Sequence, residues 1–157
     1  MTVPARVLVI KLSALGDMVL AFPAFDRIRG AHPEAHITLL TTDPYAALAA
    51  SGPWFDAVDP GGRPRTLPGS LALFRRIRRG RFDRVYDLQA NDRTTLLFQA
   101  LRPFPPAWSG TAFGCALPDR GPRMTRHTLE RQAHQLLTAG VWPDAPTGPG
   151  TAPAPAV

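Results

Sequence analysis

The stretch VLVIKLSALGDMVLAFPAF, from Val7 to Phe25, decides the fold because it joins a strand pattern to a helix pattern through one short loop. Val7 to Ile10 form an apolar run without polar alternation, which is typical of a strand buried on both faces in a parallel sheet. In open α/β sheets, ligands bind beyond the carboxyl ends of the strands. We therefore expect the residues just after Ile10 to line the functional site.

The loop after Ile10 contains a single glycine, which disfavours the common nucleotide-binding motifs. A P-loop needs G-x-x-x-x-G-K-[ST] and the dinucleotide fingerprint needs three spaced glycines, and neither pattern occurs here. What remains is S-x-x-G-D, from Ser13 to Asp17. In this pattern Gly16 is expected to permit a tight turn, and Asp17 stands at a helix start on the ligand side.

The rest of the chain alternates between strand and helix patterns, which predicts an α/β fold with a Rossmann-like open parallel sheet and helices on both faces. Strands are predicted near residues 6–11, 36–41, 57–59, 84–88 and 107–109. Helices are predicted near residues 17–30, 44–50, 70–79, 92–101 and 128–139. Asp43 is expected to cap the second helix, and Pro23 is expected to bend the first.

The composition fits one compact α/β domain followed by a tail. The chain is 45% hydrophobic and 19% charged, and no apolar run approaches the length of about 20 residues that a membrane span needs. A domain is predicted over residues 1–141, because a compact domain commonly has about 100 to 150 residues. Residues 142–157 are rich in Pro, Gly and Ala and are predicted to form a disordered or linker tail.

The cysteine content and the N-terminus favour a cytoplasmic protein. Cys115 is the single cysteine, so an internal disulfide is impossible and a reducing compartment is expected. Lys11 and Asp17 interrupt the first apolar stretch, which is therefore a poor match to a signal peptide.

The net charge of +6 comes almost entirely from arginine, because Lys11 is the single lysine among 18 basic residues. An anionic partner is consistent with this balance. The densest patch lies on one predicted amphipathic helix and consists of Arg75, Arg76, Arg78 and Arg79. Four interpretations stay open: a solvated helix face, contact with a phosphorylated lipid acceptor, contact with the anionic inner leaflet of the membrane, and contact with nucleic acid.

These motifs resemble the heptosyltransferases of glycosyltransferase family nine, which build the inner core of lipopolysaccharide. The first strand and loop of that family match here at Lys11, Ser13, Gly16, Asp17, Pro23 and Ala24. RFDRVYDLQANDR, from Arg81 to Arg93, resembles the family block that ends in D-L-Q-G-N-x-R-S, and HPEAHITLLTT from His32 resembles its second strand. The chain departs from the pattern at Ala90, Asp92 and Thr94.

The resemblance implies the N-terminal, acceptor-side half of a two-domain GT-B enzyme. Such an enzyme would transfer a heptose from a nucleotide sugar, ADP-heptose, to a lipopolysaccharide-type acceptor with inversion. No metal or other cofactor is implied. The expected partners are a lipid-linked or phosphorylated saccharide acceptor, a separate chain carrying the donor domain, and the inner face of the cytoplasmic membrane as a peripheral contact. This chain alone is expected to be inactive, because one substrate-binding surface is missing.

The resemblance also assigns roles to residues. Asp17 is the family's proposed catalytic base, and the alternative is a simple helix cap. The residues expected to contact the acceptor are Lys11, Ser13, Gly16, Gln89, Asn91 and Arg93. For Lys11 the alternative is a strand-end lysine whose ammonium reaches water, and for Ser13 it is a bond to its own backbone.

Arg93 carries an additional argument, because a cation in the first turn of a helix opposes the helix dipole. A bound phosphate or carboxylate would compensate for this, and the alternative is an ion pair with Asp92 or Asp87.

A second class of function stays open at this point. The chain would then be a non-catalytic Rossmann-like module that binds an anionic ligand through its cleft, or nucleic acid through the Arg-rich helix, although nucleic acid is the less expected partner.

Overall fold

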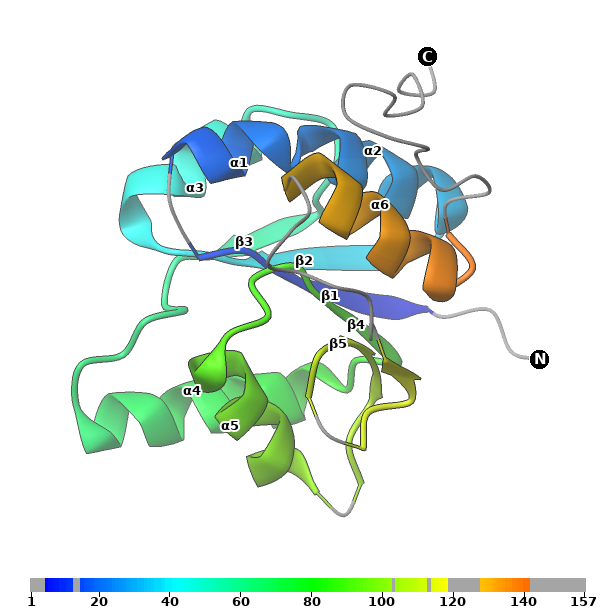
Figure 1. Cartoon of the computed structure of the whole chain (residues 1–157). Helices are drawn as coiled ribbons and strands as arrows, with labels where there is room; N and C mark the ends of the chain where they lie inside the picture. Colours follow the sequence, from blue (N-terminus) through cyan, green and yellow to red (C-terminus); the bar gives the residue numbers. More distant parts are fainter. Residues whose placement is uncertain (1–4, 13–14, 103, 113, 119–127, 142–157) are drawn as a thin grey trace.

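A computed structural model describes residues 5–12, 15–102, 104–112, 114–118 and 128–141. Its centre is a six-stranded parallel sheet in the order β3-β2-β1-β4-β5-β6, with helices on both faces (Figure 1). The strands are β1 (Arg6–Ile10), β2 (His36–Leu40), β3 (Ala57–Asp59), β4 (Arg84–Asp87), β5 (Ala107–Gly110) and β6 (Leu117–Pro118). The predicted fold class is confirmed.

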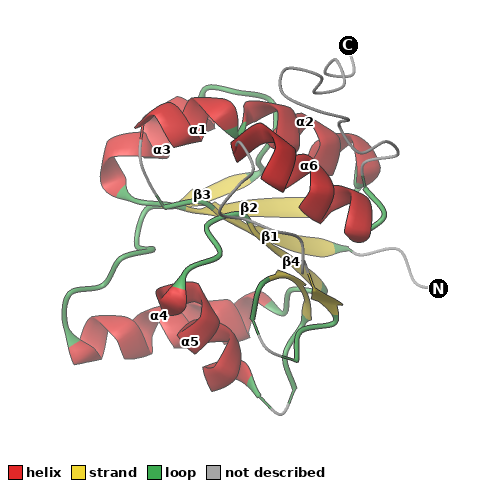
Figure 2. Ribbon diagram, viewed as in Figure 1, coloured by secondary structure: helices red, strands yellow, loops and turns green. Residues whose placement is uncertain are grey.

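The helices form one layer on each side of the sheet. The bounds are α1 (Leu15–Leu20), α2 (Phe22–Ala31), α3 (Asp43–Ala50), α4 (Leu67–Gly80), α5 (Asp92–Leu101) and α6 (Thr128–Thr138). Figure 2 shows α1, α2, α3 and α6 on one side of the sheet, and α4 and α5 on the other. In the described residues, no helix combines the length and the apolar character that crossing a membrane requires.

The central strand β1 explains the uninterrupted apolar run in the sequence, because both of its faces are covered. Val7 and Val9 pack into the core beneath α1, α2 and α6, where Phe25 and Leu136 also lie. On the opposite face, Leu8 and Ile10 pack into a second core that includes Leu73 and Ile77 of α4 and Phe98 of α5. Successive side chains of a strand point to opposite faces, so a strand between two cores is apolar at every position.

The first predicted helix is two helices, and this expectation is therefore corrected. α1 ends at Leu20 and α2 begins at Phe22, with Ala21 between them. Pro23 lies in the first turn of α2, where a missing backbone N–H costs nothing, but it could not donate the bond that a continuous helix would require. Pro23 therefore starts a new helix instead of bending an existing one.

Two other helix starts differ from the prediction. Thr42, and not Asp43, is the N-cap residue of α3, and Asp43 is the first residue inside the helix. The α4 helix begins at Leu67, three residues before the predicted start, because the Thr66 side chain accepts a hydrogen bond from Gly69 N at 3.1 Å and caps the helix. The short strand β6 was not predicted. The predicted tail from 142 to 157 lies outside the described residues.

Candidate functional site

The loops that follow β1 and β4 meet at the carboxyl edge of the sheet. Leu12 N donates a hydrogen bond to Gln89 Oε1 at 2.9 Å, although 77 residues separate the two positions. Directly after the last paired residues of β1 and β4, Leu88 N donates a hydrogen bond to Ile10 O at 3.0 Å and extends the pairing of the two strands. The sequence placed both loops at this edge, and the structure joins them directly.

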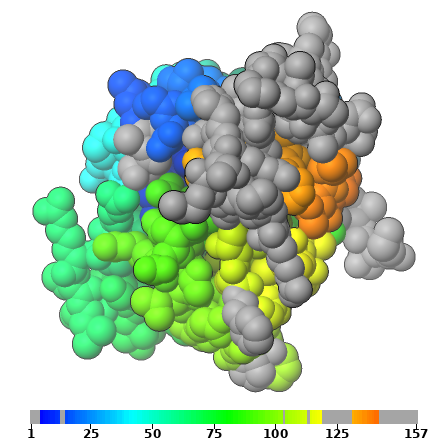
Figure 3. Space-filling view, in the orientation of Figure 1, coloured from blue at the N-terminus to red at the C-terminus, as the bar shows by residue number. Residues whose placement is uncertain are grey.

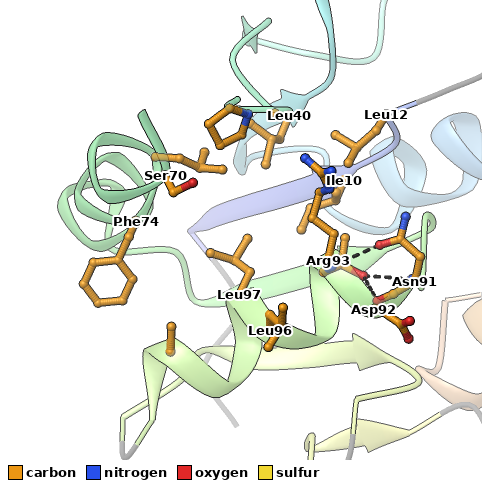
Figure 4. A pocket seen from close by; sticks show the side chains of 15 residues that line it. Ile10, Leu12, Leu40, Ser70, Phe74, Asn91, Asp92, Arg93, Leu96 and Leu97 are labelled. Carbon is orange, nitrogen blue, oxygen red and sulfur yellow. Dashed lines mark hydrogen bonds between the residues drawn. The ribbon is translucent and has the colours of Figure 1, made fainter. Parts of the chain in front are cut away.

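A cavity of about 700 Å³ opens at the same edge, between the end of β1 and the helices α4 and α5 (Figure 4). Most of its lining is aliphatic or aromatic: Ile10, Leu12, Leu40, Leu73, Phe74, Leu96, Leu97 and Ala100. The start of α5 supplies polar residues: Asn91, Asp92, Arg93 and Thr94. The cavity therefore combines an apolar wall with a polar end that carries one guanidinium, Arg93, and one carboxylate, Asp92, a combination suited to a polar ligand with an anionic group near Arg93.

The side chain of Asn91 organises the polar end by capping α5. Its Oδ1 accepts a hydrogen bond from Thr94 N at 3.0 Å, and Thr94 Oγ1 accepts one from Asn91 N at 3.0 Å (Figure 4). This reciprocal capping box fixes the loop against the helix. Because Thr94 supplies its hydroxyl, the departure from serine at this position preserves the box. Because the side-chain oxygen Oδ1 of Asn91 already accepts from Thr94 N, the side-chain Nδ2 group is left as the donor toward a ligand.

Arg93 is exposed at the first turn of α5 and reaches toward the end of β1 in Figure 4. It makes no ion pair or hydrogen bond with any residue that the structure describes, so the alternative of a pair with Asp92 or Asp87 is not realised. A positive charge near the positive end of a helix is unfavourable unless an anion compensates for it. Arg93 is therefore a strong candidate for anion binding.

Asp17 lies in α1 and is half-buried. Its carboxylate accepts no hydrogen bond from the described part of the chain, so the simple capping alternative is not seen. Asp17 is at the same edge of the sheet as the cavity but is not among the residues that line it. Asp17 thus belongs to the layer of α1, whereas the cavity lies in the opposite layer, with α4 and α5.

The other predicted acceptor contacts lie in different surroundings. Lys11 is only 5% exposed, so its ammonium does not extend into bulk water as the alternative proposed. Gln89 is half-buried and uses its Oε1 to accept from Leu12 N, which leaves its Nε2 as a donor. Lys11 and Gln89 do not line the large cavity. Ser13 lies outside the described residues.

Gly16 occupies a helical position in α1 and not a tight turn, which corrects that expectation. A Cβ atom placed there would meet nothing within 4 Å. The surrounding fold thus gives no steric reason for a glycine, whereas a ligand that approaches the backbone closely would give one.

The Arg-rich stretch of α4 is not a uniform patch. Arg76 Nε pairs with Asp59 Oδ2 at 2.9 Å, and Arg78 Nη2 donates to Leu101 O at 3.1 Å. Arg75 and Arg79 are exposed and make no such contact with the described residues. All four arginines are exposed, but Arg76 and Arg78 also help to hold the fold, whereas Arg75 and Arg79 face solvent alone.

Sequence reasoning missed a second basic cavity at the carboxyl edge. It measures about 400 Å³ and lies between the start of α3 and the loop after β3, with Thr42, Asp43, Pro44, Tyr45, Pro60, Arg63 and Arg65 as its lining. The signal was present as GGRPR, from Gly61 to Arg65, directly after a predicted strand. Basic residues at that position belong to the ligand edge of a parallel sheet.

Gly62 explains why this loop lies so close to the large cavity. Its N–H donates to Thr41 O at 2.8 Å. A Cβ atom at this position would stand 2.5 Å from Leu12 Cδ2 and 2.6 Å from Thr41 O, so a larger residue would displace the loop.

These features define an α/β domain of the Rossmann-like class, with a charged site at the carboxyl edge of a parallel sheet. Among solved structures, the chain is similar to the glycosyl transferase family 9 protein from Veillonella parvula DSM 2008, with a TM-score of 0.72 and 28% identity over 87% of this chain and 41% of that chain. The predicted resemblance to this family and the glycosyltransferase-like fold are confirmed.

A second similar structure is the heptosyltransferase WaaC of E. coli with ADP. Its TM-score is 0.61 and its identity 19%, over 91% of this chain and 49% of that chain, which supports the fold alone. The chain thus spans less than half the length of either solved protein. No family model and no curated protein matches the chain.

Proposed function

We propose that this chain is the acceptor-side half of a glycosyltransferase that transfers a heptose from ADP-heptose to a lipopolysaccharide-type acceptor. The observation that carries the proposal is the likeness to the family-nine structure across 87% of this chain but only 41% of that one. A second domain of similar size would then hold the nucleotide sugar. The reaction would take place in the cytoplasm.

Inversion requires the acceptor hydroxyl to attack the anomeric carbon on the face opposite the leaving group. The new carbon–oxygen bond forms while the bond to the nucleoside diphosphate breaks, and ADP leaves with the electron pair of that bond. Asp17 of α1 would take the hydroxyl proton as the new bond forms. The absence of hydrogen bonds from described residues leaves its oxygens available to the hydroxyl.

The remaining contacts would orient the acceptor. Gln89 and Asn91 each use the side-chain oxygen within the protein, so both amides would act on the acceptor as N–H donors. Arg93 would bind a phosphate or carboxylate with its planar guanidinium. Lys11 would contribute positive charge, Gly16 would allow the acceptor to approach the backbone of α1, and Ser13 keeps the acceptor contact that the family resemblance implies.

The test is transfer in a two-part system that combines this chain with a separately expressed donor-binding domain. Release of ADP from ADP-heptose is followed with a phosphorylated inner-core saccharide as acceptor. We expect this chain alone to give little or no turnover, because positioning both substrates is a large part of such catalysis. Asp17→Asn should lower the rate of the combined system by about 100-fold or more, the usual contribution of general base catalysis.

Glu34→Gln is the matched control, because Glu34 is an exposed carboxylate that precedes β2 at the opposite edge of the sheet. It should leave the rate unchanged. An Asp17→Asn system as fast as the wild-type system would refute the base assignment, and turnover by this chain alone would refute the half-enzyme assignment.

A further inference from the structure

The outward face of α4 is basic along its second half. Leu73 and Ile77 are the buried residues of this helix, and Arg75, Arg78 and Arg79 are exposed. The helix contains four arginines and no acidic residue. Figure 3 shows α4 and α5, in green, in the lower part of the molecular surface.

An exposed aromatic side chain extends this basic face beyond the end of α4. A small hollow of about 200 Å³ brings Arg78 and Arg81 together with Phe104. Phe104 is 80% exposed, and Leu71 on α4 is 48% exposed. We call these residues the α4 patch: Leu71, Arg75, Arg78, Arg79, Arg81 and Phe104.

The charge of the α4 patch is not neutralised within the described fold. Arg75, Arg79 and Arg81 make no side-chain hydrogen bond or ion pair with residues that the structure describes. Arg76 differs, because Asp59 is near enough to pair with it. Like charges four residues apart, such as Arg75 and Arg79, destabilise a helix. Arg79 lies in the last turn, where a cation favours the helix dipole, but its repulsion from Arg75 remains for an anionic partner to relieve.

We propose that the α4 patch binds the surface of an anionic phospholipid bilayer. The guanidinium groups would pair with lipid phosphates, and Phe104 and Leu71 would enter the boundary between headgroups and acyl chains. Charge alone would also suit nucleic acid, but the two exposed apolar side chains favour the bilayer, where they leave water. Arginine can keep its head in the interface while its aliphatic stem lies against apolar groups.

The position of the α4 patch links it to the site. Ser70, Leu73 and Phe74 of the same helix line the large cavity, so the patch and the cavity belong to one layer of the fold. A bilayer bound at the patch would lie beside the entrance to the cavity. Delivery of a lipid-linked acceptor would follow from this placement and rests on the proposed function, whereas binding to the bilayer does not.

Co-sedimentation with vesicles tests the proposal without any measurement of activity. The chain is mixed with vesicles of phosphatidylcholine alone, or of phosphatidylcholine and phosphatidylglycerol in equal parts. We expect binding to the anionic vesicles only. The double variant Arg75→Gln/Arg79→Gln should bind on the order of 30-fold more weakly, because each arginine near an anionic membrane surface contributes about 1 kcal/mol to binding.

Two further variants separate the patch from net charge and from apolar insertion. Arg65→Gln/Arg93→Gln removes the same charge from the exposed edge near the two larger cavities and should weaken binding far less. Phe104→Ser should weaken binding at both low and high salt, because apolar contacts are not screened, whereas the effect of the arginines should shrink as salt rises. Circular dichroism melting checks that each variant is folded.

Three results would overturn the proposal. One is equal binding to neutral and anionic vesicles, or none to either. Another is an equal loss in the two double variants, which would mean that net charge alone drives binding. The last is a wild-type chain that binds a labelled single-stranded oligonucleotide but no vesicles, with weaker oligonucleotide binding in the patch variants. This result would assign the surface to nucleic acid.

Discussion

At the scale of the residue, Ala90 shows why the family pattern has a glycine where this chain does not. Ala90 has a φ of +47°, in the left-handed region, and its N–H donates to Asp87 Oδ1 at 2.7 Å. A side chain in that conformation costs about 1 to 2 kcal/mol, while glycine loses about 0.5 to 1 kcal/mol in chain entropy. The loop keeps its shape with alanine but at a cost in stability.

We therefore expect Ala90→Gly to raise the free energy of unfolding by about 0.5 to 1 kcal/mol. Urea denaturation would measure this change. Ala72→Gly, at an exposed position in the interior of α4, is the matched control and should lower stability by about 1 kcal/mol. An Ala90→Gly variant less stable than the wild type would mean that the left-handed backbone is not strained.

A buried histidine gives the fold a dependence on pH. His32 Nε2 lies 2.6 Å from the Tyr86 hydroxyl, and both residues are buried. Burial lowers the pKa of His32 below its usual 6.5, and the nearby Arg84 and Arg29 lower it further. The neutral imidazole is therefore the form that the folded state favours.

Stability should decrease as the pH falls below about 6.5, because the unfolded chain then binds a proton that the folded chain resists. The loss should level off once the pH is below the lowered pKa of the folded state. Denaturation midpoints at successive pH values measure it. His32→Gln should remove this part of the pH dependence, and the exposed His36→Gln should keep it. Unchanged stability across this range in the wild type would refute the effect of burial on His32.

Residues also mark the limit of what the sequence could predict. The apolar run and the Gly-Asp pair made it possible to predict that Asp17 follows a buried strand and a short loop. The unbonded state of Arg93 was not predictable, because it depends on where Asp87 and Asp92 point after the chain has folded. The basic cavity at Arg63 and Arg65 was missed because its other wall comes from the start of α3, about twenty residues earlier.

At the scale of the element, periodicity predicted what long segments do but not where they begin. Strand β1 was predicted because it is apolar at every position from Val7 to Ile10, while β6 has two residues and shows no period. The start of α4 at Leu67 depends on a cap by Thr66. Pro68 lies in the first turn of the helix, and in the sequence a proline at this position also fits a turn. Where single caps and prolines decide an element's end, the sequence pattern is least informative.

The short helix α1 offers a way to separate structure from function. Gly16→Ala should stabilise this helix by up to about 1 kcal/mol, because alanine is the better helix former and the Cβ position is open. If a ligand approaches the backbone here, the same substitution should weaken acceptor binding. Thermal melting and acceptor titration would measure the two effects.

Gly30→Ala in α2 is the control, because its Cβ position is also open and the helix ends away from the carboxyl edge. It should raise stability and leave acceptor binding unchanged. Equal acceptor affinity in both alanine variants and the wild type would show that no ligand contacts Gly16.

At the scale of the whole molecule, the sequence pattern of a parallel sheet predicts at which edge the site lies, but not the shape of the site. The alternation of strands and helices predicted a parallel sheet, and the observed strand order β3-β2-β1-β4-β5-β6 brings the ends of β1 and β4 together. The large cavity depends on how α4 and α5 pack against each other and against Leu12. Its apolar wall comes from side chains that, in the sequence, could not be distinguished from ordinary core residues.

Backbone NMR of the ¹⁵N-labelled chain, titrated with a de-acylated and phosphorylated inner-core saccharide, tests the central claim most directly. If the joined loops after β1 and β4 bind the acceptor, amide shifts should move first at Leu12, Gly16, Asn91 and Arg93, with Arg93→Gln weakening the effect. Shifts confined to other surfaces, or no shift at saturating saccharide, would contradict the account.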